Sequence, residues 1–433
     1  MSTFVEDGDK SYLGHHTVSI SKFSSHKNPV RKNLGIPRAF PIIIYHYYYG
    51  KSFQQREKDN VIAALGHPDR VREVSFHIQG PRLGKLATAM QEPFPVLTNL
   101  YISAWDGITP ILPGRFLGRY APCLWQINLR GVPFPALPTL LLSTHDLVSL
   151  ILHKIPSTGY ISPEAMRTGL AALPRLETFM IIFLFATPRP HRIRPAPPIT
   201  RIVLPALTCF EFEGASEYLE DLVVNIDSPR LDNIRIAYLN QLIDFQVVQL
   251  SKFIHRSVGL KLTSLRRAQV AFFKKNVYFD LWPHANYPRS KAYRGSNLIT
   301  IKCEGIDWQV SHMAQVLSHF PATLSNVVHL EFDGFQSSVM DDVECLHLLH
   351  QFSNVQTLYV SEAFARHVAL ALEGLTGEMV TEVLPSLDLI YLEGQPASSI
   401  ERFVALRQLS GRHVTSFDKE TAFDDMLKSY VNE

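Results

Sequence analysis

The chain has 433 residues, of which 46% are hydrophobic, and this is enough to bury a continuous core. Its 42 Lys and Arg residues nearly balance its 40 Asp and Glu residues, so the formal net charge is only +2. The composition excludes a disordered chain, and the weak net charge argues against a nucleic acid or an anionic membrane as the partner.

The cysteine pattern and the hydropathy pattern both indicate a soluble intracellular protein, cytoplasmic or nuclear. Cys123, Cys209, Cys303 and Cys345 occur singly, without a CxxC pair, and the chain contains no Asn-x-Ser/Thr acceptor for glycosylation. The longest apolar stretch, "FMIIFLFA" (179–186), is less than half of a membrane span. The first residues also lack the charged-then-apolar order of a secretory signal.

The N-terminal part divides into two segments. Residues 1–30 show little helical periodicity, and we expect them to be poorly ordered. Residues 31–70 contain "FPIII" (40–44) followed by "YHYYYG" (45–50), whose tyrosines could stack on bases. We interpret the pair instead as a strand of an N-terminal cap, because the end of a repeat array must shield its apolar edge.

A strand-like pattern, apolar-x-x-apolar-x-apolar, then recurs at an average spacing of about 29 residues, close to the period of leucine-rich repeats. Its twelve copies begin at Val71, Leu97, Leu124, Leu147, Leu176, Leu207, Leu231, Leu265, Leu298, Val327, Val355 and Leu387.

The flanks of these copies support the repeat. Proline stands two residues before six of them, where it ends a preceding helix and favours an extended backbone: Pro95, Pro122, Pro174, Pro205, Pro229 and Pro385. Glycine stands seven residues after the first apolar position in five copies, where it suits a sharp turn: Gly131, Gly214, Gly305, Gly334 and Gly394.

Segments with helical spacing lie between the strands. We predict helices within 59–66, 162–173, 217–226, 245–254, 308–317, 342–352 and 399–409. Ser162, followed by Pro163 and Glu164, has the residues of a helix start. The sequence therefore predicts an α/β fold over 31–418: an irregular right-handed leucine-rich-repeat-like solenoid, with about twelve parallel concave strands and convex helices.

The array departs from regular repeats in two ways. The Asn that usually follows the strand is replaced in several copies, so we expect no Asn ladder. Insertions also lengthen two intervals, at 186–201 and 283–297, and residues 419–433 form a C-terminal tail. The first insertion holds five prolines, and we interpret it as an exposed rim loop, with a proline-rich docking peptide as the alternative.

Five phrases of the sequence carry a resemblance to a known family: "LPGRFLGRYAP" (112–122), "GVPFPALPTLLLS" (131–143), "GYISPEAM" (159–166), "SEYLEDLVVNIDSPRL" (216–231) and "IDWQ" (306–309). They resemble the leucine-rich-repeat portion of the expanded F-box protein families of mushroom-forming fungi. The similarity runs from about Arg31 to about Asp418. The resemblance implies a substrate receptor of a cullin-type ubiquitin ligase, in which an N-terminal F-box binds the ligase adaptor and the repeats present a substrate.

Residues 1–30 differ from that family, because they lack the Leu-Pro-led three-helix segment of an F-box. Either the gene model is truncated, or the chain is a paralogue that binds a partner without delivering ubiquitin. On this sequence alone we expect no adaptor binding.

The chain carries no GxSxG, HExxH or GxGxxG motif, so we expect no enzymatic activity and no cofactor. The nearest phosphate-loop match, "GPRLGKL" (80–86), has the wrong glycine spacing and lacks the Ser or Thr that binds Mg²⁺. Cys345, His347 and His350 could bind a metal, but we interpret them as packing and surface residues.

The strand register predicts which side chains lie on the concave face, because alternate residues point to opposite faces of a sheet. As candidate partner-binding residues we select Arg130, Ile151, His153, Met180, Ile182, Glu211, Glu213, Arg235, Arg267, Glu331, Tyr359 and Tyr391.

Among these, Ile151, Met180 and Ile182 should form an apolar island on adjacent strands, and exposed apolar groups bordered by charge are typical of a binding centre. Next to the island we expect an acidic group, Glu211 and Glu213, and then a basic group, Arg235 and Arg267. Alternatively, the proline-rich insertion covers the island. The hypothesis is a non-enzymatic protein-interaction solenoid whose protein partner is unknown. The alternatives are an enzyme with an unrecognised site and a decayed structural paralogue without a partner.

Overall fold

The computed structural model describes residues 18–19, 40–47, 55–106, 110–185, 200–239, 247–261, 264–282, 297–302, 306–334 and 342–417. Several segments named above lie outside these ranges: most of 1–30, residues 48–50, most of both insertions, Gly305 and the tail 419–433.

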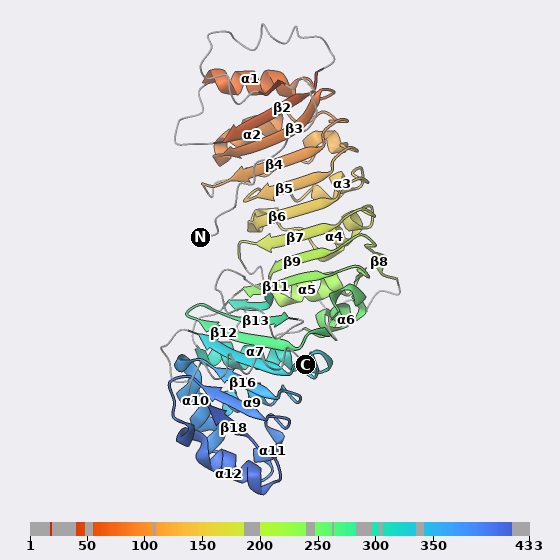
Figure 1. The fold of residues 1–433 in the computed structure, drawn as a ribbon. Coiled ribbons are helices and arrows are strands. Elements are labelled where there is room, and N and C mark those ends of the chain that lie inside the picture. Colours follow the sequence, from red (N-terminus) through yellow and green to blue (C-terminus); the bar gives the residue numbers. More distant parts are fainter. Residues whose placement is uncertain are drawn as a thin grey trace.

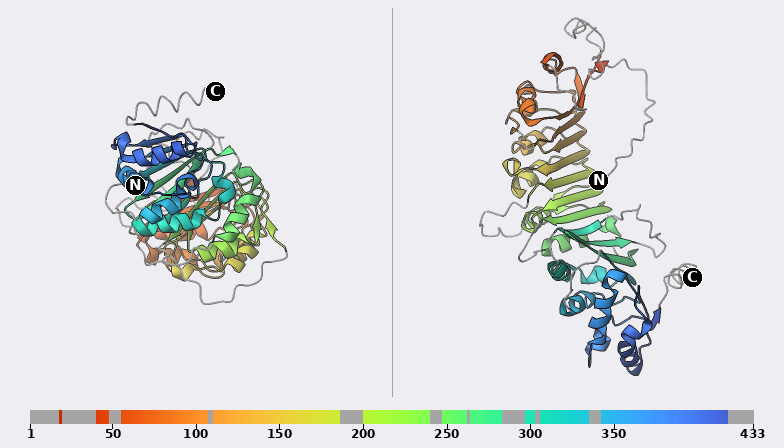
Figure 2. Two further views of the ribbon diagram at one scale, coloured as in Figure 1. Left: turned by 90° about the horizontal axis from the view of Figure 1, so that it is seen from below. Right: turned by 90° about the vertical axis from the view of Figure 1, so that its left-hand side faces the viewer.

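Within the described residues, sixteen strands form one large and mostly parallel sheet, in the order β1-β2-β3-β4-β5-β6-β7-β9-β11-β14-β13-β12-β15-β16-β17-β18. The strands lie one after another along the length of the molecule (Figure 1), and helices lie along one face of the sheet (Figure 2). The bounds of the first nine are β1 (Val18–Ser19), β2 (Ile42–Tyr47), β3 (Val71–Ile78), β4 (Asn99–Ala104), β5 (Gln126–Arg130), β6 (Ser149–Ile155), β7 (Thr178–Phe183), β9 (Cys209–Gly214) and β11 (Asn233–Leu239). The others are β12 (Arg267–Phe273), β13 (Asn276–Trp282), β14 (Asn297–Lys302), β15 (His329–Gly334), β16 (Thr357–Val360), β17 (Leu389–Leu392) and β18 (Thr415–Phe417).

A strand is present at each of the twelve predicted repeats, and β2 lies in the segment expected as a cap strand. Two short strands, β8 (Ile202–Val203) and β10 (Ile226–Asp227), pair separately from the large sheet. The predicted register is also confirmed, because Leu207, Phe210 and Phe212 are all buried in the core.

Helices are present in all seven segments where the sequence predicts them. They are α1 (Gln55–Leu65), α4 (Pro163–Leu170), α5 (Ser216–Val223), α6 (Val248–Arg256), α7 (Ile306–Leu317), α9 (Asp342–Leu349) and α12 (Glu401–Leu409). Further helices are α2 (Gly80–Thr88), α3 (Leu137–Leu141), α8 (Pro321–Leu324), α10 (Glu362–Glu373) and α11 (Met379–Glu382). The rejected phosphate-loop match therefore lies on α2, not on a loop.

The twelve predicted strands run parallel to one another, but the expectation that they follow one another in sequence order is wrong at one place, where an additional strand, β13, is inserted. Strand β11 pairs with β14, and β13 lies between β14 and β12, antiparallel to both. The physical reason is the tight turn after β12: Lys274 and Lys275 alone separate Phe273 from Asn276, so β12 and β13 form a hairpin. The parallel order resumes where β12 pairs with β15.

Candidate interaction surface

We call the face of the sheet that points away from the helices the open face. Its side chains form rows across the strands, since neighbouring strands are paired residue by residue. The middle row runs through Ser75, Tyr101, Asn128, Ile151, Met180, Glu211 and Arg235.

Two apolar side chains stand next to each other in the middle row. Ile151 pairs with Met180, and both are partly exposed. Ile182 was expected to belong with them, but it is only 6% exposed, so it is not part of an exposed apolar surface. Most of the proline-rich insertion, the alternative cover for this row, lies outside the described residues. The exposed apolar centre of the open face is therefore the pair Ile151 and Met180.

Charged groups follow the apolar pair, as the sequence predicts. Glu211 pairs with Met180 on one side and with Arg235 on the other. Burial raises the pKa of Glu211, while the charge of Arg235 acts in the opposite direction. Lys302 of β14 forms an ion pair with Glu213 of β9, with a distance of 2.5 Å between Nζ and Oε1. This pair crosses β11, where the small Ala237 lies opposite Glu213.

The structure does not bring Arg235 and Arg267 together, because β14 and β13 separate their strands. Arg267 instead forms an ion pair with Glu331, which also accepts a hydrogen bond of 3.2 Å from Gln269. Arg267 is 8% exposed and Glu331 is 9% exposed. The sequence analysis expects both side chains to be exposed to a partner, and this is wrong, because both are buried. Their ion pair holds β12 against β15.

Tyr359 and Tyr391 are also buried, although the alternation rule places both on the open face. Their rings stack at a centroid distance of 5.0 Å, and Phe417 of β18 packs against them. The Tyr359 hydroxyl donates a hydrogen bond of 2.8 Å to Glu393. This apolar contact, which the sequence analysis does not predict, explains why the two tyrosines are not available to a partner.

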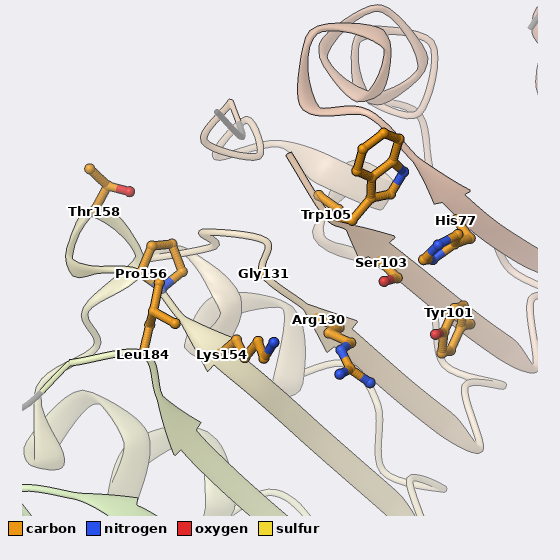
Figure 3. Close-up of a pocket in the computed structure, with 11 residues that line it drawn as sticks. His77, Tyr101, Ser103, Trp105, Arg130, Gly131, Lys154, Pro156, Thr158 and Leu184 are labelled. Atoms are coloured by element: carbon orange, nitrogen blue, oxygen red, sulfur yellow. The ribbon is translucent and has the colours of Figure 1, made fainter. Parts of the chain in front are cut away.

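A hollow of about 510 Å³ opens at the carboxyl ends of β3 to β7, next to the middle row (Figure 3). Its lining includes His77, Tyr101, Trp105, Arg130, Lys154 and Leu184. The sequence analysis selects only Arg130 from this set. A useful signal would have been the residues that directly follow the predicted strands, since Trp105 and Leu184 both stand there.

The hollow concentrates positive charge. Among the described residues, neither Arg130 nor Lys154 forms an ion pair or a side-chain hydrogen bond. His153 is paired with Arg130. Burial, followed by the charges of Arg130 and Lys154, lowers the pKa of His153 to about 4, so this imidazole is neutral at physiological pH.

The described part of the chain holds no cluster of three or more His, Cys, Asp and Glu residues that could bind a metal ion. Cys345 is buried, and burial raises the pKa of its thiol to about 12, whereas His347 and His350 are exposed. None of the helices that the structure describes is long and apolar enough to span a membrane.

Comparisons with known proteins add little to this description. No protein-family model and no curated protein matches the chain. Among solved structures, the chain is similar to the leucine-rich repeat-containing protein LegL7 from Legionella pneumophila, at 12% sequence identity and a TM-score of 0.28, over 92% of this chain and 99% of that one. A TM-score this low carries no argument about fold or function.

Proposed function

We propose that the chain is a non-enzymatic interaction protein that binds another protein on the open face between β3 and β11. The observation that carries this proposal is the paired placement of Ile151 and Met180, both partly exposed, on adjacent strands of a face that is otherwise mainly polar. An apolar centre with a polar and charged border is the usual composition of a protein-binding surface.

The resemblance to fungal F-box proteins supports a more specific form of the proposal. In that form, the array is a leucine-rich-repeat-like solenoid that works as the substrate-recognition part of a ubiquitin-ligase receptor. The bound partner is then the protein to be ubiquitinated, and the described residues supply only its recognition.

The proposal is tested by affinity capture from the native cell with mass spectrometry, using three proteins: the unmodified chain, the double variant Ile151→Arg with Met180→Arg, and a control. The control is Leu370→Arg, because Leu370 is an exposed leucine of α10. A captured protein is then produced alone, and its Kd is measured for all three.

We expect both variants to fold like the unmodified chain, because the substituted side chains are exposed or partly exposed. The double variant should weaken binding by at least about 2 kcal/mol, the loss typical of a central hot spot, and the control should bind normally. Equal binding by all three proteins would contradict the proposed surface.

A further inference from the structure

We propose that the open face carries a second interaction surface at its C-terminal end, where the chain's own strand β18 covers a site for an extended, aromatic-bearing segment of another protein. The site consists of Tyr359, Leu389 and Tyr391 together with the edge of β17, and we call it the tyrosine site. It lies on β16 and β17, far in the sheet order from Ile151 and Met180 on β6 and β7. The proposal therefore goes beyond the proposed function and does not depend on it.

The tyrosine site is an apolar cluster on a face that is otherwise mainly polar. Tyr359, Leu389 and Tyr391 form a cluster separate from the main core. Their neighbours in the strands, Leu358 and Ile390, belong to the main core, so the alternation of side chains places the cluster on the open face. The two tyrosine rings are stacked, with centroids 5.0 Å apart and an angle of 16° between their planes. A contiguous apolar surface of this kind is typical of a protein-binding site.

The cover that the structure describes is β18, which lies at the C-terminal end of the array (Figure 1). Phe417 packs against the cluster, and the three residues of the strand pair in parallel with Leu389, Ile390 and Tyr391. β18 is the last strand in the sheet order, so no strand among the described residues pairs with its outer edge. An edge strand of three residues therefore separates the tyrosine site from solvent.

The attachment of β18 favours its displacement. Thr415 is exposed, and Ser416 and Phe417 are both partly exposed, so the strand buries little of its own surface. The few contacts of three edge residues offset little more than the conformational entropy that the strand loses when it is ordered. Val414, directly before β18, is buried in the main core. Displacement can therefore be limited to the three residues of β18 and leave the rest of the fold in place.

The contacts of β18 define what another segment must offer. The backbone N–H of Thr415 donates a hydrogen bond of 2.8 Å to the carbonyl oxygen of Asp388, and an added strand would reproduce such main-chain bonds. β18 pairs with three of the four residues of β17 and leaves out Leu392, so a longer segment gains pairing that β18 does not make. An aromatic side chain in the place of Phe417 would pack on the ring of Tyr391.

The test uses a fluorescein-labelled peptide with the sequence of residues 412–417, Arg-His-Val-Thr-Ser-Phe, and measures its binding by polarisation. Two variants weaken β18 without changing the tyrosine site: Phe417→Ser removes the covering ring, and Thr415→Pro removes the N–H that reaches Asp388. The unmodified chain is compared with both, and the matched control is Leu409→Ser, because Leu409 is 84% exposed on the preceding helix α12. Two altered peptides carry Ser in the place of Phe or Pro in the place of Thr.

We expect both β18 variants to bind the peptide roughly tenfold or more tightly than the unmodified chain does, because the chain's own strand no longer competes for the site. The control should bind like the unmodified chain. Each altered peptide should bind the β18 variants roughly tenfold or more weakly than the original peptide, since it lacks either the aromatic ring or the main-chain donor.

Equal binding of the peptide by all four proteins, or equal binding of the three peptides, would overturn the inference. Far-UV circular dichroism checks the fold of each variant, and unfolding of both β18 variants would also overturn it, because β18 would then be an integral part of the array. A dimer of the unmodified chain that dissociates in Phe417→Ser would assign the site to a second copy of this chain and not to another protein.

Discussion

At the residue scale, Asp280 is the buried carboxyl group with the clearest consequence for stability. It lies on β13 and is only 8% exposed. Burial raises the pKa of Asp280 to about 7, although the charge of Arg235 and a backbone hydrogen bond from Leu298 act in the opposite direction. The folded chain therefore retains a proton on Asp280 at pH values where the unfolded chain has lost it.

We predict that this proton makes the stability of the chain pH-dependent. Between about pH 4 and pH 7 the folded state binds more protons than the unfolded state, so the free energy of unfolding falls as the pH rises through this window. Asp280→Asn removes this contribution. Relative to the unmodified chain, the variant should therefore gain stability from pH 4 to pH 7, by at most ~4 kcal/mol, and no more above pH 7.

Urea denaturation of both proteins at unit steps from pH 4 to pH 8 measures this difference. The shifted pKa values of His153 and His329 affect both proteins equally and cancel in the comparison. A stability difference that stays constant with pH would show that Asp280 is ionised in the folded state throughout.

At the element scale, helix α4 begins as its sequence predicts. Ser162 is the residue before the helix, and its hydroxyl accepts a hydrogen bond of 3.2 Å from the backbone N–H of Ala165. Pro163 occupies the first helical turn, where its missing N–H costs nothing. Met166 and Leu170 of the same helix are buried in the core.

We predict that Ser162→Ala lowers the free energy of unfolding by about 1 kcal/mol, because one N–H group of the first turn loses its acceptor. Ser162→Asp should retain the stability, since a carboxylate accepts the same bond and interacts favourably with the helix dipole. Thermal denaturation compares the three proteins. If the Asp variant were as unstable as the Ala variant, the loss would not come from capping.

Local pattern predicts these elements well, because each depends on residues close together in the sequence. The recurring Leu and Val positions fix the strands, and Ser162 with Pro163 fixes a helix start. The open face is harder to predict, since exposure depends on which strands become neighbours. Arg235 and Arg267 belong to consecutive repeats, but β14 and β13 lie between their strands. Phe417 of the neighbouring strand β18 packs against Tyr359 and Tyr391.

At the scale of the whole molecule, contacts run mainly between neighbouring units along the sheet. The buried Glu220 of α5 shows this directly, because its carboxylate accepts hydrogen bonds of 2.8 Å from the backbone N–H groups of Gln249 and Leu250, at the start of α6. In arrays of this kind, stability is a sum of local terms, so distant parts can open separately.

We predict that a cavity at one end of the sheet lowers the local stability at that end only. Phe364 of α10 is buried, with its ring 5.0 Å from that of Phe272, and Phe364→Ala should remove about 3–5 kcal/mol of local stability. Hydrogen exchange followed by mass spectrometry should then accelerate within 342–417 and stay unchanged within 97–152. Equal acceleration of both segments would mean that the sheet opens as one cooperative unit.

The reversed strand order around β13 also governs how the chain assembles while it is being synthesised. Strands β2 to β7, β9 and β11 can each pair with the preceding strand as soon as they leave the ribosome. The other edge of β11 pairs with β14, and the β12–β13 hairpin is synthesised between the end of β11 at Leu239 and the start of β14 at Asn297. At ordinary translation rates this interval is on the order of several seconds. During it, β11 presents an unpaired edge, the feature through which nascent chains pair wrongly or exchange strands with a neighbouring copy. We therefore predict that translation speed between β11 and β14 changes how much of the chain reaches its native form.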